Sequence, residues 1–326
     1  MDLSLKQKRI LELLAQNCRF ANKDVAKQVG LSEDAVQYQI QKLIEDEKLG
    51  LPYIQFDYEM LGYRQYHVWI TLREVNCDLT QLMKLDNVIN INTSFGKFDL
   101  QIIFIEKTQD DFQKKLEKLY EMLPIKEVST ARAEDAYKSI NNVIPDLYVG
   151  TKIPINKKNK MYSVIGSVPL QFRGKFEIDD VDKKIIQELM KNPRGKYSEI
   201  SKKTGINHET IRVRLNKYIE SRFINHCSLL LNYKKFGLYT NYLLLKLNKI
   251  DELSFKEYLN RDNSIIYAAK LFGEYNCIFY LVTKDPYELG KKLKEIRTFL
   301  GDNIQKIDLL YLEEITKFVQ FPTKLT

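Results

Sequence analysis

Apolar residues near the N-terminus recur at the spacing of amphipathic helices. Ile10, Leu13 and Leu14 follow i, i+3, i+4 spacing, and residues 25–29 repeat it. Gly30 then ends the second helix. A third helix follows, with a buried stripe of Val36, Ile40, Leu43 and Ile44. Three helices with a glycine-containing turn between the second and third are typical of a helix-turn-helix, and the short strand after them would form a wing.

The chain after the wing changes to period-two alternation. Residues 66–72 (YHVWITL) place alternate apolar side chains on one face of a strand. A helix near 78–85, two strands, a helix at 110–122 and a final strand at 125–137 complete the order β-α-β-β-α-β. This order predicts a ferredoxin-like domain, and the fold class is therefore α+β.

The whole pattern occurs twice. Residues 10–31 align with residues 185–206 at an offset of 175, and residues 94–104 align with residues 271–281 at an offset of 177. Each copy is longer than the ~20–50 residues of a solenoid repeat, so each is expected to be a complete module. The chain is therefore predicted to be a tandem duplication.

One strand of each copy is apolar on both faces: LQIIFI at 100–105 and CIFYLV at 277–282. Two helices cover only one face of such a sheet, so the other face should be buried against a second sheet. The other copy is the most available partner. We expect the two ferredoxin-like domains to pair sheet to sheet, within one chain or between chains.

The repeat defines five segments. They are a winged helix-turn-helix at 1–55, a ferredoxin-like domain at 56–140, a basic linker at 141–177, a second winged helix-turn-helix at 178–232 and a second ferredoxin-like domain at 233–326. The linker is placed by its prolines, glycines and lysines, which interrupt both periodic patterns.

Composition excludes several classes of protein. The 326 residues are 44% hydrophobic with a formal net charge of +8, which is ordinary globular composition. No apolar run reaches the ~18 residues of a membrane span and no signal peptide is evident, so a soluble cytoplasmic protein is expected. The four cysteines and three histidines form no metal-ligand or disulfide pattern. Common enzyme motifs are also missing, so no catalytic residue, metal or cofactor is expected.

Two segments have the pattern of a recognition helix: VGLSEDAVQYQIQKL at 29–43 and TGINHETIRVRLNKY at 204–218. LGY or FGL after the wing, and GKFD or GEYN between two strands, also recur in both copies. In these features the chain resembles the Lrp/AsnC family of transcription regulators. The resemblance covers nearly the whole chain except the linker.

The resemblance implies a winged helix-turn-helix joined to a ferredoxin-like domain that senses ligands and dimerises through its sheet. Family members often bind an amino acid or a similar small molecule, and they usually assemble from single-copy chains. Duplication departs from that pattern and would place the domains of a whole dimer in one polypeptide. We expect a regulator that binds double-stranded DNA, responds to a small-molecule effector and forms homo-oligomers.

The second recognition helix has the stronger DNA-binding candidates. They are Lys196, Asn207, His208, Arg212, Arg214, Asn216 and Lys217. Arg212 suits a forked contact with guanine, and Asn207 or Asn216 suits an adenine edge. The two lysines suit phosphates, and the resemblance implies a backbone-positioning role for Arg214. Each of these side chains is equally compatible with an ordinary solvated surface.

The first recognition helix is the weaker candidate. Glu33 and Asp34 at its N-terminus suit the helix dipole but would face phosphates, and Gln39 stands where the second copy has Arg214. Residues 1–55 have no net charge, whereas residues 176–232 have a net charge of +3. The remaining candidates are Ser32, Gln37, Tyr38, Gln41 and Lys42. A degenerate or protein-contacting module is the alternative for this copy.

Candidate effector residues lie in the turn between two strands of each copy. Gly96 and Gly273 permit positive φ or close approach of a ligand, and Asp99 or Asn276 follows three residues later. The resemblance implies that these turns lie near an effector pocket, with Asp99 as a partner for a ligand amine. A plain turn glycine with a capping side chain is the alternative.

Two other functions remain open from the sequence. Lrp/AsnC-like folds also occur in sirohaem decarboxylases, and Arg64 and His67 lie on or beside a strand where an anionic tetrapyrrole could bind. The second copy lacks a matching histidine, which ranks the enzyme below the regulator. A scaffold that binds protein or RNA is the other alternative, although no RNA-binding motif supports it.

Overall fold

The computed structural model describes residues 3–74, 78–139, 174–249, 251–319 and 321. Most of the expected linker, residues 141–173, lies outside the described residues. The chain forms two compact units, and each unit combines segments of both copies. The helix-turn-helix unit comprises residues 3–57 and 176–237, and the barrel unit comprises residues 58–139 and 238–321.

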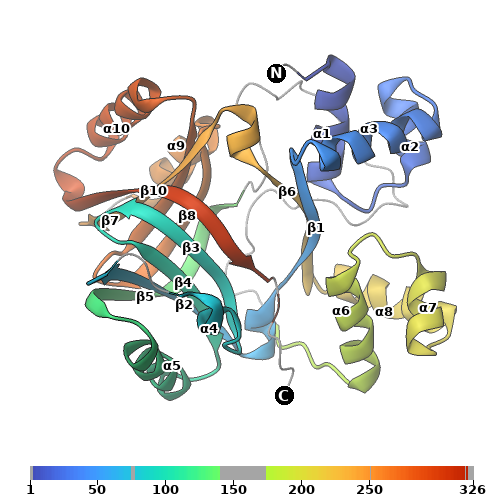
Figure 1. Cartoon of the computed structure of the whole chain (residues 1–326), viewed down its shortest axis with the longest axis horizontal. Coiled ribbons are helices and arrows are strands. Elements are labelled where there is room, and N and C mark those ends of the chain that lie inside the picture. The colour runs from blue at the N-terminus through green and yellow to red at the C-terminus, as the bar shows by residue number, and fades with distance from the viewer. Residues whose placement is uncertain (1–2, 75–77, 140–173, 250, 320, 322–326) are drawn as a thin grey trace. The chain divides into compact units, whose positions relative to one another are not determined.

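Each copy contributes three helices to the helix-turn-helix unit, as the apolar spacing predicts (Figure 1). They are α1 (Leu5–Gln16), α2 (Asn22–Val29) and α3 (Glu33–Glu45) in the first copy, and α6 (Asp180–Lys191), α7 (Tyr197–Thr204) and α8 (His208–Glu220) in the second. Gly30 and Gly205 end α2 and α7 with left-handed backbone conformations, φ 65° and 71°. Ser32 and Asn207 then cap the third helices by accepting hydrogen bonds from backbone amides.

The strand after each third helix pairs with its counterpart in the other copy (Figure 1). β1 (Leu49–Phe56) and β6 (Ile224–Leu231) form an antiparallel two-stranded sheet in which Ile54 lies opposite Cys227. The sequence predicts a separate wing in each copy, whereas the structure has one ribbon made by both. A lone strand leaves backbone N–H and C=O groups unpaired along both edges, and the equivalent strand supplies partners along one of them.

The barrel unit contains the order β-α-β-β-α-β twice. In the first copy the elements are β2 (Arg64–Leu72), α4 (Thr80–Met83), β3 (Val88–Gly96), β4 (Leu100–Glu106), α5 (Gln109–Met122) and β5 (Ile125–Ser139). In the second copy they are β7 (Tyr239–Leu247), α9 (Glu252–Arg261), β8 (Ile265–Gly273), β9 (Cys277–Thr283), α10 (Pro286–Leu300) and β10 (Ile304–Phe318). The α+β class and the duplicated ferredoxin-like order are confirmed.

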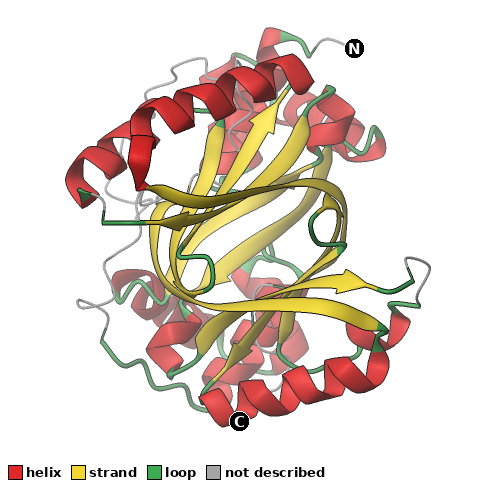
Figure 2. Cartoon of the chain, turned by 90° about the vertical axis from the view of Figure 1, so that its left-hand side faces the viewer, coloured by secondary structure: helices red, strands yellow, loops and turns green. Residues whose placement is uncertain are grey.

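The two ferredoxin-like sheets close into one barrel (Figure 2). The strand order is β10-β3-β4-β2-β5-β8-β9-β7, and β7 pairs again with β10. Two seams join the copies, one between β3 and β10 and the other between β5 and β8, and both are antiparallel. Each sheet alone would end in two open edges, so closure gives all four edge strands a partner.

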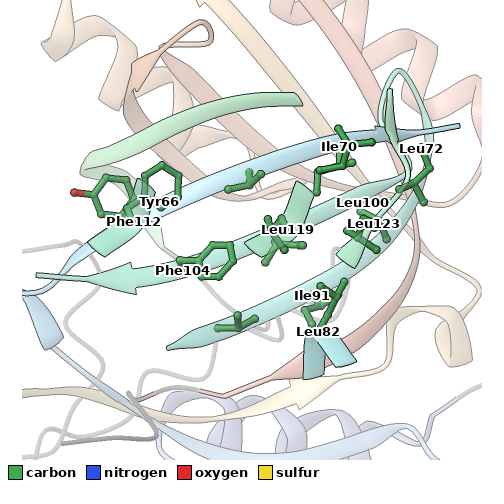
Figure 3. Close-up of a cluster of buried hydrophobic side chains, with 14 residues drawn as sticks. Tyr66, Ile70, Leu72, Leu82, Ile91, Leu100, Phe104, Phe112, Leu119 and Leu123 are labelled. Atoms are coloured by element: carbon green, nitrogen blue, oxygen red, sulfur yellow. The ribbon is translucent and has the colours of Figure 1, made fainter. Parts of the chain in front are cut away.

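Three apolar clusters stabilise the barrel unit. In the first copy, α4 and α5 pack against the sheet through side chains that include Leu82, Phe104 and Leu119 (Figure 3). α9 and α10 pack an equivalent cluster in the second copy. The faces without helices meet in a third cluster, which includes Trp69 and Tyr275. The sheet faces that the sequence expects to be buried therefore line the barrel interior.

Within the described ranges, no helix has both the length and the apolar character needed to cross a membrane. Over the same residues, no group of three or more His, Cys, Asp or Glu side chains is placed to hold a metal ion.

Gly96 and Gly273 lie at the two seams, where the strands leave no room for a side chain. A Cβ at Gly273 would stand 2.4 Å from the backbone oxygen of Thr130 and 2.8 Å from the Cβ of Ala131. A Cβ at Gly96 would stand 2.5 Å from the backbone oxygen of Leu309, and the φ of Gly96 is +134°. Glycine is therefore required at these positions by the joining of the copies.

We predict that Gly273→Ala destabilises the barrel by about 1–3 kcal/mol, because the seam strands must move apart to admit the methyl group. The measurement is urea unfolding followed by fluorescence of Trp69, the chain's single tryptophan, which is buried in the barrel interior. Gly290→Ala is the matched control, because a Cβ there meets nothing within 4 Å. Gly290 lies within α10, so alanine should raise stability there by up to about 1 kcal/mol. Equal effects at the two sites would contradict the crowding argument.

Candidate nucleic-acid interface

The exposed side of α8 gathers most DNA-binding candidates of the second copy. Ile211, Leu215 and Tyr218 are buried against the domain, which turns the opposite side of the helix to solvent. The exposed candidates are Asn207, His208, Arg212, Asn216 and Lys217, and Lys196 is exposed just before α7. His208, Arg212 and Asn216 follow one another at i, i+4 spacing, so they form a continuous row along the helix.

Glu209 orients Arg212 within this row. The Nε of Arg212 donates a hydrogen bond to Oε2 of Glu209 at 2.9 Å, and its Nη2 donates to Oε1. The hydrogen bond from Arg212 holds the pKa of Glu209 below its usual range. Both side chains are exposed, so the pair adds little to stability, but it limits the orientations of the guanidinium group. The guanidinium has further N–H donors for an acceptor such as a guanine edge.

Arg214 points into its own domain. Its Nη1 donates to both carboxylate oxygens of Asp182, at 3.1 and 3.0 Å, and its Nη2 lies 2.8 Å from Oδ2 of Asp179. Asp182 is 1% exposed and also accepts a hydrogen bond from Tyr218 Oη at 2.5 Å. This network joins α6 to α8. The observed contacts of Arg214 therefore lie within its own domain, and a phosphate contact by Arg214 stays a prediction.

In the first copy, neutral residues occupy the positions equivalent to Asp182 and Arg214. Gln7 and Gln39 precede Asp182 and Arg214 by 175 residues, and Gln7 Nε2 donates to Gln39 Oε1 at 3.0 Å. The candidates Gln37, Tyr38, Gln41 and Lys42 are exposed on α3, and Ser32 is exposed at its N-cap. Acidic residues occupy the first turn of that helix. The first copy thus keeps the geometry of a recognition helix with a different set of exposed groups.

Two equivalent arginines hold the helix-turn-helix domains together. Arg19 Nη2 donates to the carbonyl of Gly195 at 3.0 Å, and its Nη1 donates to the carbonyl of Pro193. Arg194 Nη2 donates to Oδ1 of Asn22 at 2.9 Å. Each arginine therefore reaches the start of the second helix of the other copy, or the residues just before it. Arg19 and Arg194 occupy equivalent positions of the repeat. This match in the sequence could have identified them as functional residues.

The candidate effector residues take part in backbone contacts of the barrel. Asp99 Oδ2 accepts a hydrogen bond from the amide of Leu72 at 2.7 Å. Asn276 accepts from the amide of Leu247 at 2.7 Å and donates to its carbonyl at 2.8 Å. Gly96 and Gly273 lie at the seams described above. The structure gives these four residues roles in the fold, and effector binding by them stays a prediction.

His67 is a core residue of the barrel. It is fully buried, and its ring stacks on Trp69 with the ring centroids 5.5 Å apart. The side-chain nitrogens of Gln65 and Gln101 lie 2.7 and 3.3 Å from its two ring nitrogens. Burial lowers the pKa of His67 to about 3, so the imidazole is neutral near pH 7. These surroundings do not suit the general acid that the decarboxylase alternative requires.

Two helix-turn-helix domains with exposed recognition helices, joined to paired ferredoxin-like domains, define a class of DNA-binding protein. Residues 3–49 match the model for winged helix-turn-helix DNA-binding domains, and residues 178–219 match the model for AsnC-type helix-turn-helix domains. The chain belongs to the Lrp/AsnC family of helix-turn-helix transcriptional regulators, in tandemly duplicated form. It is a DNA-binding regulator of transcription, as the sequence predicts.

Several relatives match about one copy of this chain. The HTH-type transcriptional regulator FL11 of Pyrococcus furiosus is 30% identical over 127 residues, which are 38% of this chain and 83% of the relative. The HTH-type transcriptional regulator Ptr1 of Methanocaldococcus jannaschii is 30% identical over 121 residues, which are 36% of this chain and 80% of the relative.

The duplicated architecture also occurs in a solved structure, that of the siroheme decarboxylase NirDL. It aligns with 97% of this chain and 94% of its own, with a TM-score of 0.55 and 14% sequence identity. At this identity the likeness shows a shared fold alone.

We predict that Asp182→Ala destabilises the second helix-turn-helix by about 3 kcal/mol, because the buried Tyr218 and the partly buried Arg214 lose their common acceptor. Gln7→Ala is the matched control at the equivalent position, where a neutral hydrogen bond is lost at a cost of about 1 kcal/mol. Both residues complete a capping box, so loss of that cap is common to both variants. Hydrogen exchange of α8 and α3 amides, measured by mass spectrometry, reports each opening free energy. Similar losses would argue against a special role for the charged network.

We predict that neutral, buried His67 makes the barrel less stable in acid. The folded-state pKa is about 3 and the unfolded value is about 6.5, so the contribution is complete above pH 6.5 and is lost as the pH falls toward 3. Between pH 7 and pH 4.5 this loss is roughly 2–3 kcal/mol. Urea unfolding followed by Trp69 fluorescence should show a smaller loss for His67→Gln. The exposed-site variant His208→Gln should behave like the wild type, and an unchanged loss in His67→Gln would refute the assignment.

Proposed function

We propose that α8 enters the major groove of duplex DNA and supplies most of the base contacts, while α3 makes a weaker contact. The observation that supports this assignment is the exposed row of His208, Arg212 and Asn216, three hydrogen-bonding side chains along one line of the helix. The corresponding line on α3 has Glu33 instead of His208 at its first position. An acid there repels phosphates, so α3 is assigned the weaker contact.

Each side chain of the row suits a different part of the groove. Arg212, oriented by Glu209, suits the two acceptors of guanine. Asn216 suits adenine better than Asn207 does, because Asn207 already uses its Oδ1 to cap the Glu209 amide at 2.8 Å. Lys217 lies with its Nζ 4.9 Å from the ring centroid of Phe176, which holds the ammonium near the helix surface. We assign Lys217 and Lys196 to phosphates.

We also propose that a small molecule such as an amino acid modulates DNA binding, through the turns at Gly96 to Asp99 and Gly273 to Asn276. The family resemblance supports this role. A charged ligand amine would share Asp99 with the amide of Leu72, whereas Asn276 offers no charge, so the two turns should differ in ligand preference. Assembly into homo-oligomers and action in the cytoplasm belong to the same proposal.

We predict that Arg212→Ala relaxes base preference, whereas Lys217→Ala weakens binding to every duplex alike. Loss of a bidentate base contact removes about 1–3 kcal/mol of discrimination at one base pair. Loss of a phosphate contact lowers the magnitude of the slope of log affinity against log salt by about 1. Binding to a duplex selected from a random pool, measured at several salt concentrations, distinguishes the two effects.

Lys118→Ala is the matched control for this experiment, because Lys118 is an exposed lysine of α5 in the barrel unit. It should leave both base preference and salt slope unchanged. If Arg212→Ala and Lys217→Ala also left both unchanged, α8 would not be the helix that contacts DNA.

A further inference from the structure

The two recognition helices differ at most of their exposed positions. Along the row that faces outward, Glu33, Gln37 and Gln41 of α3 correspond to His208, Arg212 and Asn216 of α8. Outside this row, exposed Tyr38 corresponds to exposed Val213, and Lys42 corresponds to Lys217. The donors and acceptors offered to a base edge therefore differ, while a possible phosphate contact is common to both.

The pair of unlike helices is assembled within a single chain. The β1–β6 ribbon joins the two domains, and Arg19 and Arg194 each bind the opposite copy. The amide of Cys18 also donates to the carbonyl of Cys227 at 3.1 Å. One chain therefore presents one α3 and one α8 together. A homodimer of single-copy chains would instead present two identical helices, and its preferred site would be palindromic because the site mirrors the symmetry of the protein.

We infer that this chain recognises a non-palindromic duplex made of two unlike half-sites, one contacted by α8 and one by α3. The inference rests on the proposed function, because it takes α8 and α3 as the helices that contact DNA. The α8 half-site is expected to contain guanine and adenine at the positions of Arg212 and Asn216. The α3 half-site contains bases that suit glutamine and the acidic first turn, such as adenine for Gln37 or Gln41 and cytosine for Glu33.

The test is selection of bound duplexes from a random-sequence pool by the full chain, followed by competition. The expected motif has two dissimilar halves at fixed spacing. Two symmetrised duplexes are then made, one with the α8 half-site on both sides and one with the α3 half-site on both sides. Each should bind the wild type about tenfold more weakly or worse, because several base pairs in one half are mismatched.

A variant with matched helices sharpens the test. Glu33→His, Asp34→Glu, Gln37→Arg, Tyr38→Val and Gln41→Asn together give α3 the outward row of α8 and its neighbours Glu209 and Val213. All five positions are exposed, so the buried stripe of α3 is retained. This variant should reverse the preference and bind the duplex with two α8 half-sites more tightly than the natural motif.

The outcomes separate the inference from the proposed function. A motif in which the two halves contacted by one chain are identical, a motif with one half only, or binding of the wild type to either symmetrised duplex as tightly as to the natural motif would overturn the inference and leave DNA binding intact. Failure of the variant to change its preference would also overturn it. If no sequence were enriched at all, the proposed function itself would fail.

Discussion

Backbone hydrogen bonding between the two copies is the constraint on which both units depend. Each copy alone has a single strand after its recognition helix and a sheet with two open edges. Such edges leave N–H and C=O groups without partners and invite aggregation. The second copy supplies a partner for β1 and for both sheet edges. The position of one recognition helix relative to the other follows from this pairing, because β1 and β6 begin shortly after α3 and α8.

Charged residues near the seams differ between the two copies in a complementary way. Lys97 and Glu274 occupy equivalent turn positions and approach to 4.0 Å across the seam. Lys97 also lies 3.2 Å from Glu127, and Glu274 lies 2.5 Å from Lys306, so the signs are reversed from one copy to the other. Two identical copies would place like charges together there. Each exposed pair contributes at most about 1 kcal/mol, but the pattern favours pairing of unlike copies.

The sequence predicted the features that depend on near neighbours. Stripes of apolar residues and the caps Ser32 and Asn207 locate α3 and α8, because a helix buries residues three or four apart. Contacts between distant residues were not predictable. Asp182 meets Arg214 only because the fold places α6 beside α8, and Gly96 needs its small size because of Leu309, more than two hundred residues away. The sequence therefore left Gly96 open to a ligand role, and it offered Arg214 as a DNA contact.

The differences between copies are distributed in a way that stability alone does not explain. The buried stripe keeps its character, with Val36, Ile40 and Leu43 in α3 and Ile211, Leu215 and Tyr218 in α8. Replacing an exposed helical residue usually changes stability by less than about 0.5 kcal/mol, so the fold tolerates many residues there. In a homodimer any such change would appear in both subunits at once. In the duplicated chain, a substitution in one recognition helix leaves the other unchanged. The exposed side of each helix can therefore match the surface that it contacts.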